Sequence, residues 1–283
     1  MTEPVGYTRN IGQEELRQFL PFLQELADAA AAEILPNFLT GIHVDEKSNH
    51  TPVTRADRGA EKAMRDLIEA RFPAHGILGE EWGVREPAAA LPRYRWILDP
   101  IDGTRAFISN CFLFGNLIAL ERDDGEGFGP ILSSIAFPAA GVRAIGWKNH
   151  AELRRGPGFS QSVPMKVRPC SSLKEATLLV TSHWSTPEQV GDGRMQKLVD
   201  QAKLYRTWGD CFGYFAVASG GADIMIDPDL SYWDAAALIP VVEGAGGVIT
   251  STKGGSPLID KSAVCTAGGL HREVLQILNS SSL

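Results

Sequence analysis

The sequence predicts a protein of the α+β or α/β class with two closely packed subdomains. Three observations predict it: an amphipathic helix comes first, short apolar runs typical of strands follow, and strands then alternate with helices to the C-terminal end. With 283 residues, 44% of them hydrophobic, the chain can bury a large core. The pattern changes near residue 175, which divides the chain into residues 1–175 and 176–283.

Two helices are predicted at the N-terminal end. Apolar residues recur every three to four positions from about Gln13 to Phe38, which indicates an amphipathic helix that Pro21 could bend. A second apolar face runs from Arg58 to Arg71. Thr54, three residues before an aspartate, is typical of the start of that helix.

Short apolar runs bounded by glycine, proline and acidic residues indicate strands after residue 73. In the first part these runs are GILGEE (76–81), RWILDP (95–100), GNLIALE (115–121), ILSSIAF (131–137), VRAIGW (142–147) and AELRRG (151–156). In the second part they are TLLVTS (177–182), KLYRTW (203–208), ADIMIDP (222–228), GVIT (247–250) and AVCTAG (263–268). Helices are expected between the later runs, at about 195–202, 212–219 and 232–243, and from 271 onward. This alternation predicts a sheet covered by helices.

The composition excludes several classes of partner. A net charge of −7, with no long run of one sign, argues against a nucleic-acid or anionic-membrane surface and favours small molecules. The four cysteines are scattered without a Cys-x-x-Cys pair, which predicts reduced thiols rather than a zinc site or disulfides. No basic segment followed by an apolar one opens the chain, and no apolar run approaches the ~18 residues of a membrane span. We expect a cytoplasmic protein.

The stretch WILDPIDGTRAF (96–107) carries the clearest chemistry. Asp99 stands where a buried strand ends, Pro100 stiffens the turn, and Gly103 lets the backbone approach a ligand. Asp99 and Asp102 are close enough to share a hard cation such as Mg²⁺, and the amides of Gly103 and Thr104 can accept a phosphate. The alternative is that both acids only form a turn. A haloacid-dehalogenase loop is excluded, because its nucleophilic aspartate would stand at residue 100, and that residue is proline.

Four segments in the same order resemble the inositol monophosphatase family. They are TPVTRAD (51–57), GILGEEWG (76–83), DPIDGT (99–104) and WDAAALIPVVEGAGG (233–247). They resemble, in turn, the family's Val-Thr-x-x-Asp element, its Gly-Glu-Glu element, its metal-binding signature and its second signature. The resemblance implies a layered α-β-α-β-α fold of the sugar-phosphatase type, and a homodimer. Most metal ligands would lie in residues 1–175.

Carried over to this sequence, the resemblance implies a lithium-sensitive phosphomonoesterase with two or three Mg²⁺ ions. The expected ligands are Glu80, Asp99, Asp102, Asp234 and the carbonyl of Ile101, with Asp57 acting through water. The expected catalytic residues are Glu80, Thr104 and Asp102, with direct attack by metal-activated water and no phosphoenzyme. Gly103 and Thr104 would bind the phosphate. Simpler interpretations stay open: Glu80 as a solvated loop residue, Asp57 as a helix cap, and Asp234 as a charge that complements a helix dipole.

The run WGDCFGY (208–214) indicates the substrate. It resembles the Trp-Gly-Asp-Cys-Tyr-Gly-Tyr run of the histidinol-phosphate phosphatases of this family, with Phe212 in place of tyrosine. The implied substrate contacts are Gly209, Asp210, Cys211 and Asp227. Histidinol phosphate carries an ammonium and an imidazole, which these acids would bind. The alternatives are an inositol-1-phosphate or broad-specificity phosphatase and, more remotely, a non-catalytic metal- or phospholipid-binding regulator.

Other residues of interest have simpler interpretations. The simpler interpretation of Asp210 is that it caps a helix that starts at residue 211, a role that is compatible with substrate binding. The aromatic residues Trp208, Phe212, Tyr214 and Phe215 are expected in the core. Five of the six histidines are expected to face solvent without forming a metal site: His43, His50, His75, His150 and His271.

Overall fold

The computed structural model describes residues 6–41, 44–46, 52–88, 90–183 and 193–280. Its helices are α1 (Gln13–Ile34), α2 (Arg55–Arg71), α3 (Thr104–Ile108), α5 (Arg194–Gln201), α6 (Asp210–Ala218), α7 (Tyr232–Gly244), α8 (Pro257–Asp260) and α9 (His271–Leu278). Its strands are β1 (Val44–Glu46), β2 (Pro52–Thr54), β3 (Gly76–Gly79), β4 (Gly83–Arg85), β5 (Arg93–Asp102), β6 (Gly115–Asp123), β7 (Phe128–Phe137), β8 (Val142–Trp147), β9 (His150–Arg155), β10 (Gln161–Pro164), β11 (Thr177–Val180), β12 (Leu204–Arg206), β13 (Ile224–Asp227), β14 (Val248–Thr250) and β15 (Ala263–Thr266). No described helix is both long enough and apolar enough to cross a membrane.

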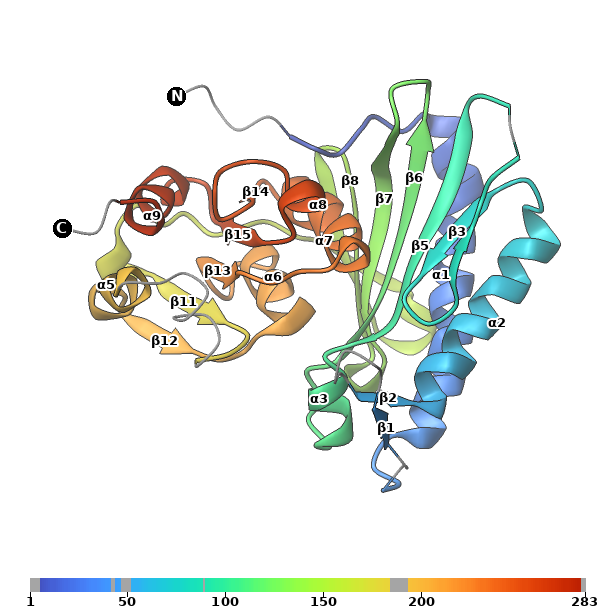
Figure 1. Cartoon of the computed structure of the whole chain (residues 1–283), viewed down its shortest axis with the longest axis horizontal. Helices are drawn as coiled ribbons and strands as arrows, with labels where there is room; N and C mark the ends of the chain where they lie inside the picture. The colour runs from blue at the N-terminus through green and yellow to red at the C-terminus, as the bar shows by residue number, and fades with distance from the viewer. Residues whose placement is uncertain (1–5, 42–43, 47–51, 89, 184–192, 281–283) are drawn as a thin grey trace.

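These elements form five layers (Figure 1). Helices α1 and α2 cover one face of an eight-stranded sheet, and α6 and α7 lie between that sheet and a five-stranded one. Helices α5 and α9 lie beyond the second sheet, on its outer side. The predicted α-β-α-β-α layering is therefore confirmed.

The two sheets differ in topology. The larger has the strand order β10-β9-β8-β7-β6-β5-β3-β4 and is antiparallel except for the β3–β5 pair. The smaller has the order β12-β11-β13-β15-β14, with β11 parallel to both of its neighbours. Every strand predicted from the sequence is present. The short strands β1, β2, β4 and β10 were not predicted, because three or four residues are too few to display an alternating pattern.

The division of the chain near residue 175 remains our proposal. The larger sheet ends with Pro164 and the smaller begins with Thr177, so a boundary at 175 falls between them. The α-helical layer in the middle packs against both sheets, and the two parts share one buried cluster.

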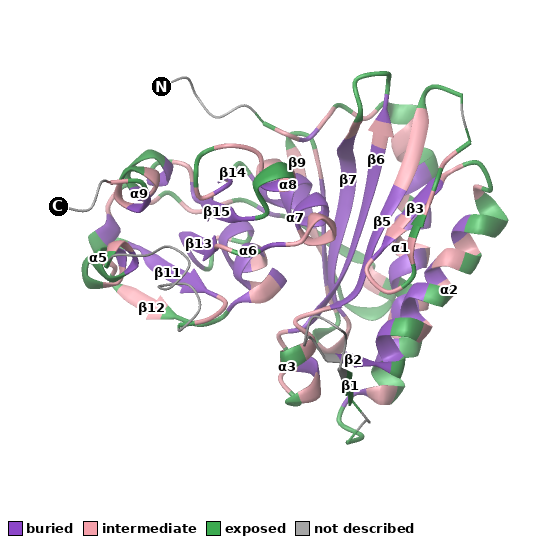
Figure 2. Cartoon of the chain, viewed as in Figure 1, coloured by how far each residue is buried: buried purple, intermediate pink, exposed green. Residues whose placement is uncertain are grey.

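Helix α7 shows why the middle layer is so apolar. Every residue from Ala235 to Val242 is buried, because one side of the helix meets the larger sheet and the other meets the smaller one (Figure 2). A helix enclosed in this way needs no polar face. Helices α1 and α2 are amphipathic instead, with one face on the sheet and one in solvent.

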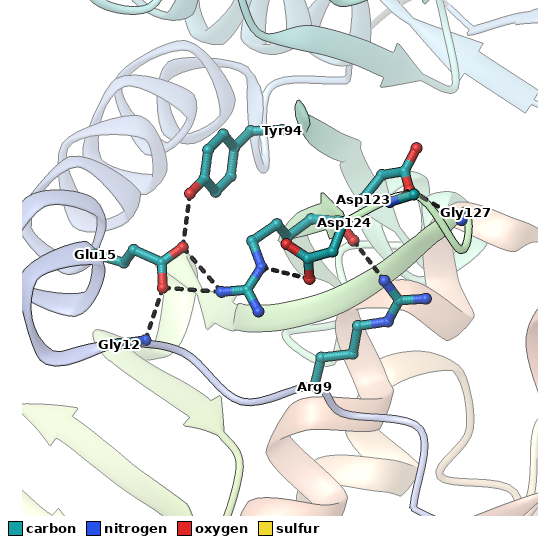
Figure 3. A network of polar contacts seen from close by, with 9 residues as sticks. Arg9, Gly12, Glu15, Tyr94, Asp123, Asp124 and Gly127 are labelled. Atoms are coloured by element: carbon teal, nitrogen blue, oxygen red, sulfur yellow. Dashed lines mark hydrogen bonds and ion pairs between the residues drawn. The ribbon is translucent and has the colours of Figure 1, made fainter. Parts of the chain in front are cut away.

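A polar network joins the start of α1 to strands β5 and β6 of the larger sheet (Figure 3). The carboxylate of Glu15 accepts hydrogen bonds from the Gly12 amide at 2.7 Å, the Tyr94 hydroxyl at 2.7 Å and the Arg122 guanidinium at 2.9 Å. Arg9 donates to the Arg122 carbonyl at 3.1 Å. The network joins the N-terminal segment to β5 and β6.

The predicted exposure of His271 is wrong. Its ring is buried, and hydrogen bonds join Nε2 to Thr250 Oγ1 at 2.9 Å and Nδ1 to Thr266 Oγ1 at 3.0 Å. Burial lowers the pKa of His271 to about 4. The sequence pattern did not indicate this position, because the two threonines come from β14 and β15. His43 and His50 lie outside the described residues.

Candidate active site

A bulge at the end of β5 sets the position of its two aspartates. Asp99 pairs with Leu117 of β6, but Asp102 pairs with Gly115, so β5 contains one extra residue between them. Asn116 lies opposite this bulge, and its buried Nδ2 donates to the carbonyls of Asp99 at 3.1 Å and Pro100 at 3.2 Å. Bulges of this kind change the direction of side chains. Sequence reasoning missed Asn116, which has no signal beyond being polar in an apolar run.

Three carboxylates meet at this strand end. Asp99, Asp102 and Asp234 each offer an oxygen, and these oxygens lie within 4.8 Å of one another. Burial, followed by the charges of Glu80, Asp234 and Asp102, raises the pKa of Asp99 well above its usual range. Burial and then the charge of Asp102 raise the pKa of Asp234 well above its usual range. The simple turn interpretation does not explain such crowding.

The cluster fits a hard cation. Asp99 Oδ1 is buried and has no hydrogen-bond partner among the described residues, although buried polar atoms almost always have one. Carboxylate oxygens are the ligands that Mg²⁺ and similar ions prefer. A cation would also offset the mutual repulsion of the three acids. The donor set and its electrostatics therefore match a divalent metal ion.

Asp234 and Asp57 both occupy the third position of a helix. Asp234 accepts a hydrogen bond from the Ser231 amide at 3.0 Å, so it caps α7 and also faces the acidic cluster. Asp57 accepts from the amide and the hydroxyl of Thr54, both at 2.7 Å, which makes it a cap of α2 as well. Burial raises the pKa of Asp57, and the charge of Glu80 acts in the same direction. Capping and proximity to the cluster thus coexist.

The buried carboxylate of Glu61 on α2 binds the backbone of the turn that carries Glu80. The Glu80 amide donates to the Leu98 carbonyl at 3.1 Å. Glu61 accepts hydrogen bonds from the amides of Glu81 at 2.7 Å and Trp82 at 3.1 Å. A Cβ at residue 79 would lie 1.9 Å from Glu61 Oε1, so this position requires glycine. Sequence reasoning missed Glu61, although a charged residue on the apolar face of α2 was a signal.

Gly103 and Thr104 connect β5 to α3. Gly103 has φ 75°, in the left-handed region that glycine adopts without strain. The Thr104 hydroxyl donates to the Ile101 carbonyl at 3.1 Å. A Cβ at residue 103 would lie 3.0 Å from Asp210 Oδ2, so the carboxylate of Asp210 lies directly beside this turn. Phosphate binding by the two amides remains a prediction.

A cavity of about 100 Å³ adjoins the cluster. It is lined by Asp102, Thr181, Asp210, Cys211, Tyr214, Asp227, Asp229, Leu230, Asp234 and Leu238. Two of these residues belong to the acidic cluster, and three are predicted substrate contacts. The Cys211 amide donates to Asp102 Oδ2 at 2.6 Å, which joins the cavity wall to the cluster. Gly209 does not line the cavity but packs directly against Thr181.

The cavity wall is strongly acidic. Burial, then the charge of Asp102, raises the pKa of Asp210 to about 7. Burial raises the pKa of Asp227 well above its usual range. Asp229 is an exposed third acid on the wall, and sequence reasoning did not single it out. The interpretation of Asp210 as the helix cap is wrong, because Gly209 occupies the capping position of α6.

The aromatic residues of this segment separate into buried and exposed ones. Tyr214 is buried, as predicted, and Phe212 and Phe215 are partly buried against the same cluster. Trp208 is 44% exposed, so its predicted core position is wrong. It lies in the connection between β12 and α6, before the packed face of the helix begins.

Comparisons with known proteins show the family and the fold to which this chain is similar. A sequence model described as the inositol monophosphatase family matches residues 15–283. A histidinol-phosphatase of Chlorobaculum parvum is 37% identical over 86% of this chain and 89% of its own length. A histidinol-phosphatase of Streptomyces coelicolor is 33% identical over 90% of this chain and 94% of its own length. A solved inositol monophosphatase from Zymomonas mobilis superposes with a TM-score of 0.77 at 34% identity, covering 93% of this chain and 98% of that one.

The layered fold, the acidic cluster and these matches define the class of protein: a phosphoric monoester hydrolase of a metal-dependent type. The family match covers nearly the whole chain, and several relatives exceed 30% identity. The chain belongs to the inositol monophosphatase family.

Proposed function

We propose that this enzyme hydrolyses L-histidinol phosphate to L-histidinol and phosphate with the aid of Mg²⁺. The observation that carries the proposal is the acidic cavity beside the cluster. Asp210, Asp227 and Asp229 line this cavity but are not among the three carboxylates that form the cluster. A neutral polyol would gain little from three carboxylates, whereas an ammonium and an imidazolium would form charge-assisted hydrogen bonds with them. The similarity to proteins named histidinol-phosphatase supports the same substrate.

The proposed metal ligands are Glu80, Asp99, Asp102, Asp234 and the carbonyl of Ile101, with Asp57 acting through water. They would hold about two or three Mg²⁺ ions, the usual arrangement where metals assist phosphoryl transfer. When bound, Mg²⁺ supplies a Lewis acid that lowers the pKa of water and neutralises charge on the phosphoryl oxygens. The unpartnered Oδ1 of Asp99 supports this assignment.

Thr104 and Glu80 are proposed to orient the attacking water and accept its proton. A threonine hydroxyl has one proton and two lone pairs. The Thr104 proton is directed at the Ile101 carbonyl, so its oxygen can act as an acceptor towards a water molecule. The carboxylate of Glu80 would then take the proton, and the amides of Gly103 and Thr104 would hold the phosphoryl oxygens. No side chain of the protein acts as nucleophile in this scheme.

The test is phosphate release in the presence of Mg²⁺ from histidinol phosphate, inositol 1-phosphate, a 3′-phosphonucleotide and fructose 1,6-bisphosphate. We expect kcat/KM for histidinol phosphate to exceed the others at least ~tenfold, which corresponds to ~1.4 kcal/mol of transition-state free energy. A smaller preference would refute the proposed substrate. It would favour the second candidate, an inositol-phosphate or broad-specificity phosphatase, which the similarity to the Zymomonas mobilis structure supports.

We further propose a homodimer that lithium inhibits, as the family resemblance implies, and a cytoplasmic location, as the sequence pattern predicts. Light scattering coupled to size-exclusion chromatography would measure the oligomeric state. A monomeric mass at micromolar concentration would refute the dimer, and unchanged turnover in millimolar lithium would refute the inhibition.

A further inference from the structure

Thr181 occupies a junction in the acidic cavity that no motif indicated. It directly follows β11 and is a lining residue of the cavity. Its hydroxyl donates to Asp227 Oδ2 at 2.9 Å and accepts a hydrogen bond from the Asp210 amide at 3.0 Å. One side chain therefore contacts the carboxylate of Asp227 and the backbone amide of Asp210, the two acids that the proposed function assigns to the substrate.

The parallel pairing of β11 with β13 explains why these groups meet. Strands β11 and β13 are parallel neighbours, and Val180 pairs with Ile226. The next residues are Thr181, which directly follows β11, and Asp227, which is the last residue of β13. Both therefore lie at the carboxyl ends of these two strands, at the same edge of the sheet. Ligands of open α/β sheets bind at such edges.

The start of α6 is packed onto Thr181 as closely as a backbone allows. A Cβ at residue 209 would lie 2.1 Å from Thr181 Cα, so only glycine permits this approach. The approach brings the Asp210 amide within reach of the Thr181 hydroxyl. Gly209 therefore affects the cavity by allowing the start of α6 to pack against Thr181, which lines it.

Asp210 needs this support because its backbone is strained. Its φ is 50°, in the left-handed region that costs non-glycine residues free energy. Strain of this kind persists only where neighbouring contacts hold the backbone, and the bond from the Asp210 amide to Thr181 is such a contact. The carboxylate of Asp210 is thereby held beside Gly103, next to the metal cluster.

We infer that Thr181 is a positioning residue that determines the preference for substrates with a cationic group. It holds Asp210 and Asp227 in the orientation that receives the cation, while the phosphate end binds at the metal cluster. The hydroxyl proton is donated to Oδ2 of Asp227, which leaves Oδ1 for the substrate. This inference rests on the proposed function and names the residue on which its selectivity depends.

The test compares Thr181→Val with Thr181→Ser. Valine preserves the shape of threonine but removes the donor and the acceptor, whereas serine keeps both. Each variant is assayed with histidinol phosphate and with glycerol 2-phosphate, which has no cationic group. Binding of L-histidinol to the metal-free enzyme is measured by calorimetry as a readout independent of turnover.

We expect Thr181→Val to lower kcat/KM for histidinol phosphate by about 10- to 100-fold, mainly through KM, as expected for hydrogen bonds to a charged group. Turnover of glycerol 2-phosphate should change less than about threefold, and L-histidinol binding should weaken in parallel with KM. Thr181→Ser should stay within about threefold of the wild type on both substrates. Circular dichroism confirms that each variant is folded.

The outcomes separate the two proposals. If the wild type does not prefer histidinol phosphate, the proposed substrate and this inference both fail. If the wild type prefers it and Thr181→Val retains that preference, only the inference fails. Equal losses on both substrates would show a purely structural role and would also overturn it. A Thr181→Val protein that does not fold, beside a folded Thr181→Ser with lost preference, would overturn it as well.

Discussion

Replacement of Glu61 by glutamine tests whether a buried acid on α2 holds the turn that carries Glu80. The side chain of Glu61 is fully buried and receives hydrogen bonds from two backbone amides, at 2.7 and 3.1 Å, and from Arg65 Nε at 2.7 Å. Arg65 also donates to the Gly83 carbonyl in the same turn. One carboxylate therefore supports the whole segment that follows β3.

The expected cost follows from these contacts. Glutamine offers one acceptor oxygen, and its NH₂ group would face a backbone N–H that needs an acceptor. The guanidinium of Arg65, whose side chain is only 11% exposed, would lose its counter-charge. Removing one partner of a buried ion pair typically costs about 3 to 5 kcal/mol. Replacement of a residue that orients a metal ligand typically lowers metal affinity by about 10- to 100-fold.

Urea denaturation of the metal-free protein measures the loss in the free energy of unfolding, and calorimetric titration with Mg²⁺ measures the loss in metal affinity. The matched control is Glu69→Gln on the same helix, where the carboxylate is exposed and lies 3.8 Å from Arg85. The control should change the free energy of unfolding by less than ~0.5 kcal/mol. A loss below ~1 kcal/mol in Glu61→Gln, or an unchanged Mg²⁺ affinity, would refute the assigned role of Glu61.

Three further predictions concern the cluster and the buried histidine. Asp102→Asn should lose nearly all phosphate release while circular dichroism stays native; near-wild-type turnover would contradict the catalytic assignment. Saturating Mg²⁺ at ~100 times its Kd should add about 2.7 kcal/mol to the free energy of unfolding, and chelation should reverse this; no thermal shift would count against a metal site. The pKa of His271 is about 4 in the folded protein and ~6.5 unfolded, so its contribution is complete above pH 6.5 and is lost as the pH falls towards 4. Over this pH range the wild type should lose up to ~3 kcal/mol more of its free energy of unfolding than His271→Gln does; equal pH slopes of the two proteins would refute it.

The sequence predicted the elements whose signals are local. The Thr54–Asp57 capping box, the helical faces and most strands depend on residues that are neighbours along the chain, and the structure contains them. Asp99 and Asp102 could be predicted at a strand end for the same reason. Asp234 was assigned to the cluster only through the resemblance, because nothing local in its segment points to β5.

Other parts of the site could not be predicted, because their partners are distant in sequence. Asn116 supports the bulge of β5, Glu61 supports the turn after β3, and Thr181 joins the ends of β11 and β13 to α6. Each acts on backbone or side-chain groups that only the packing of layers brings near. A polar residue in an apolar run shows that it is buried, but not which group it binds.

By itself, the sequence determined the local features of the candidate site: the acids of DPIDGT near a strand end, the glycines that allow tight turns, and the apolar patterns of the strands and helices around them. Only the tertiary structure decided how acidic the cavity is and which residues contact its acids. The physical reason is that hydrogen bonds and charge interactions depend on distance and burial. Those quantities arise when β5, α6 and α7, far apart along the chain, come together at one site.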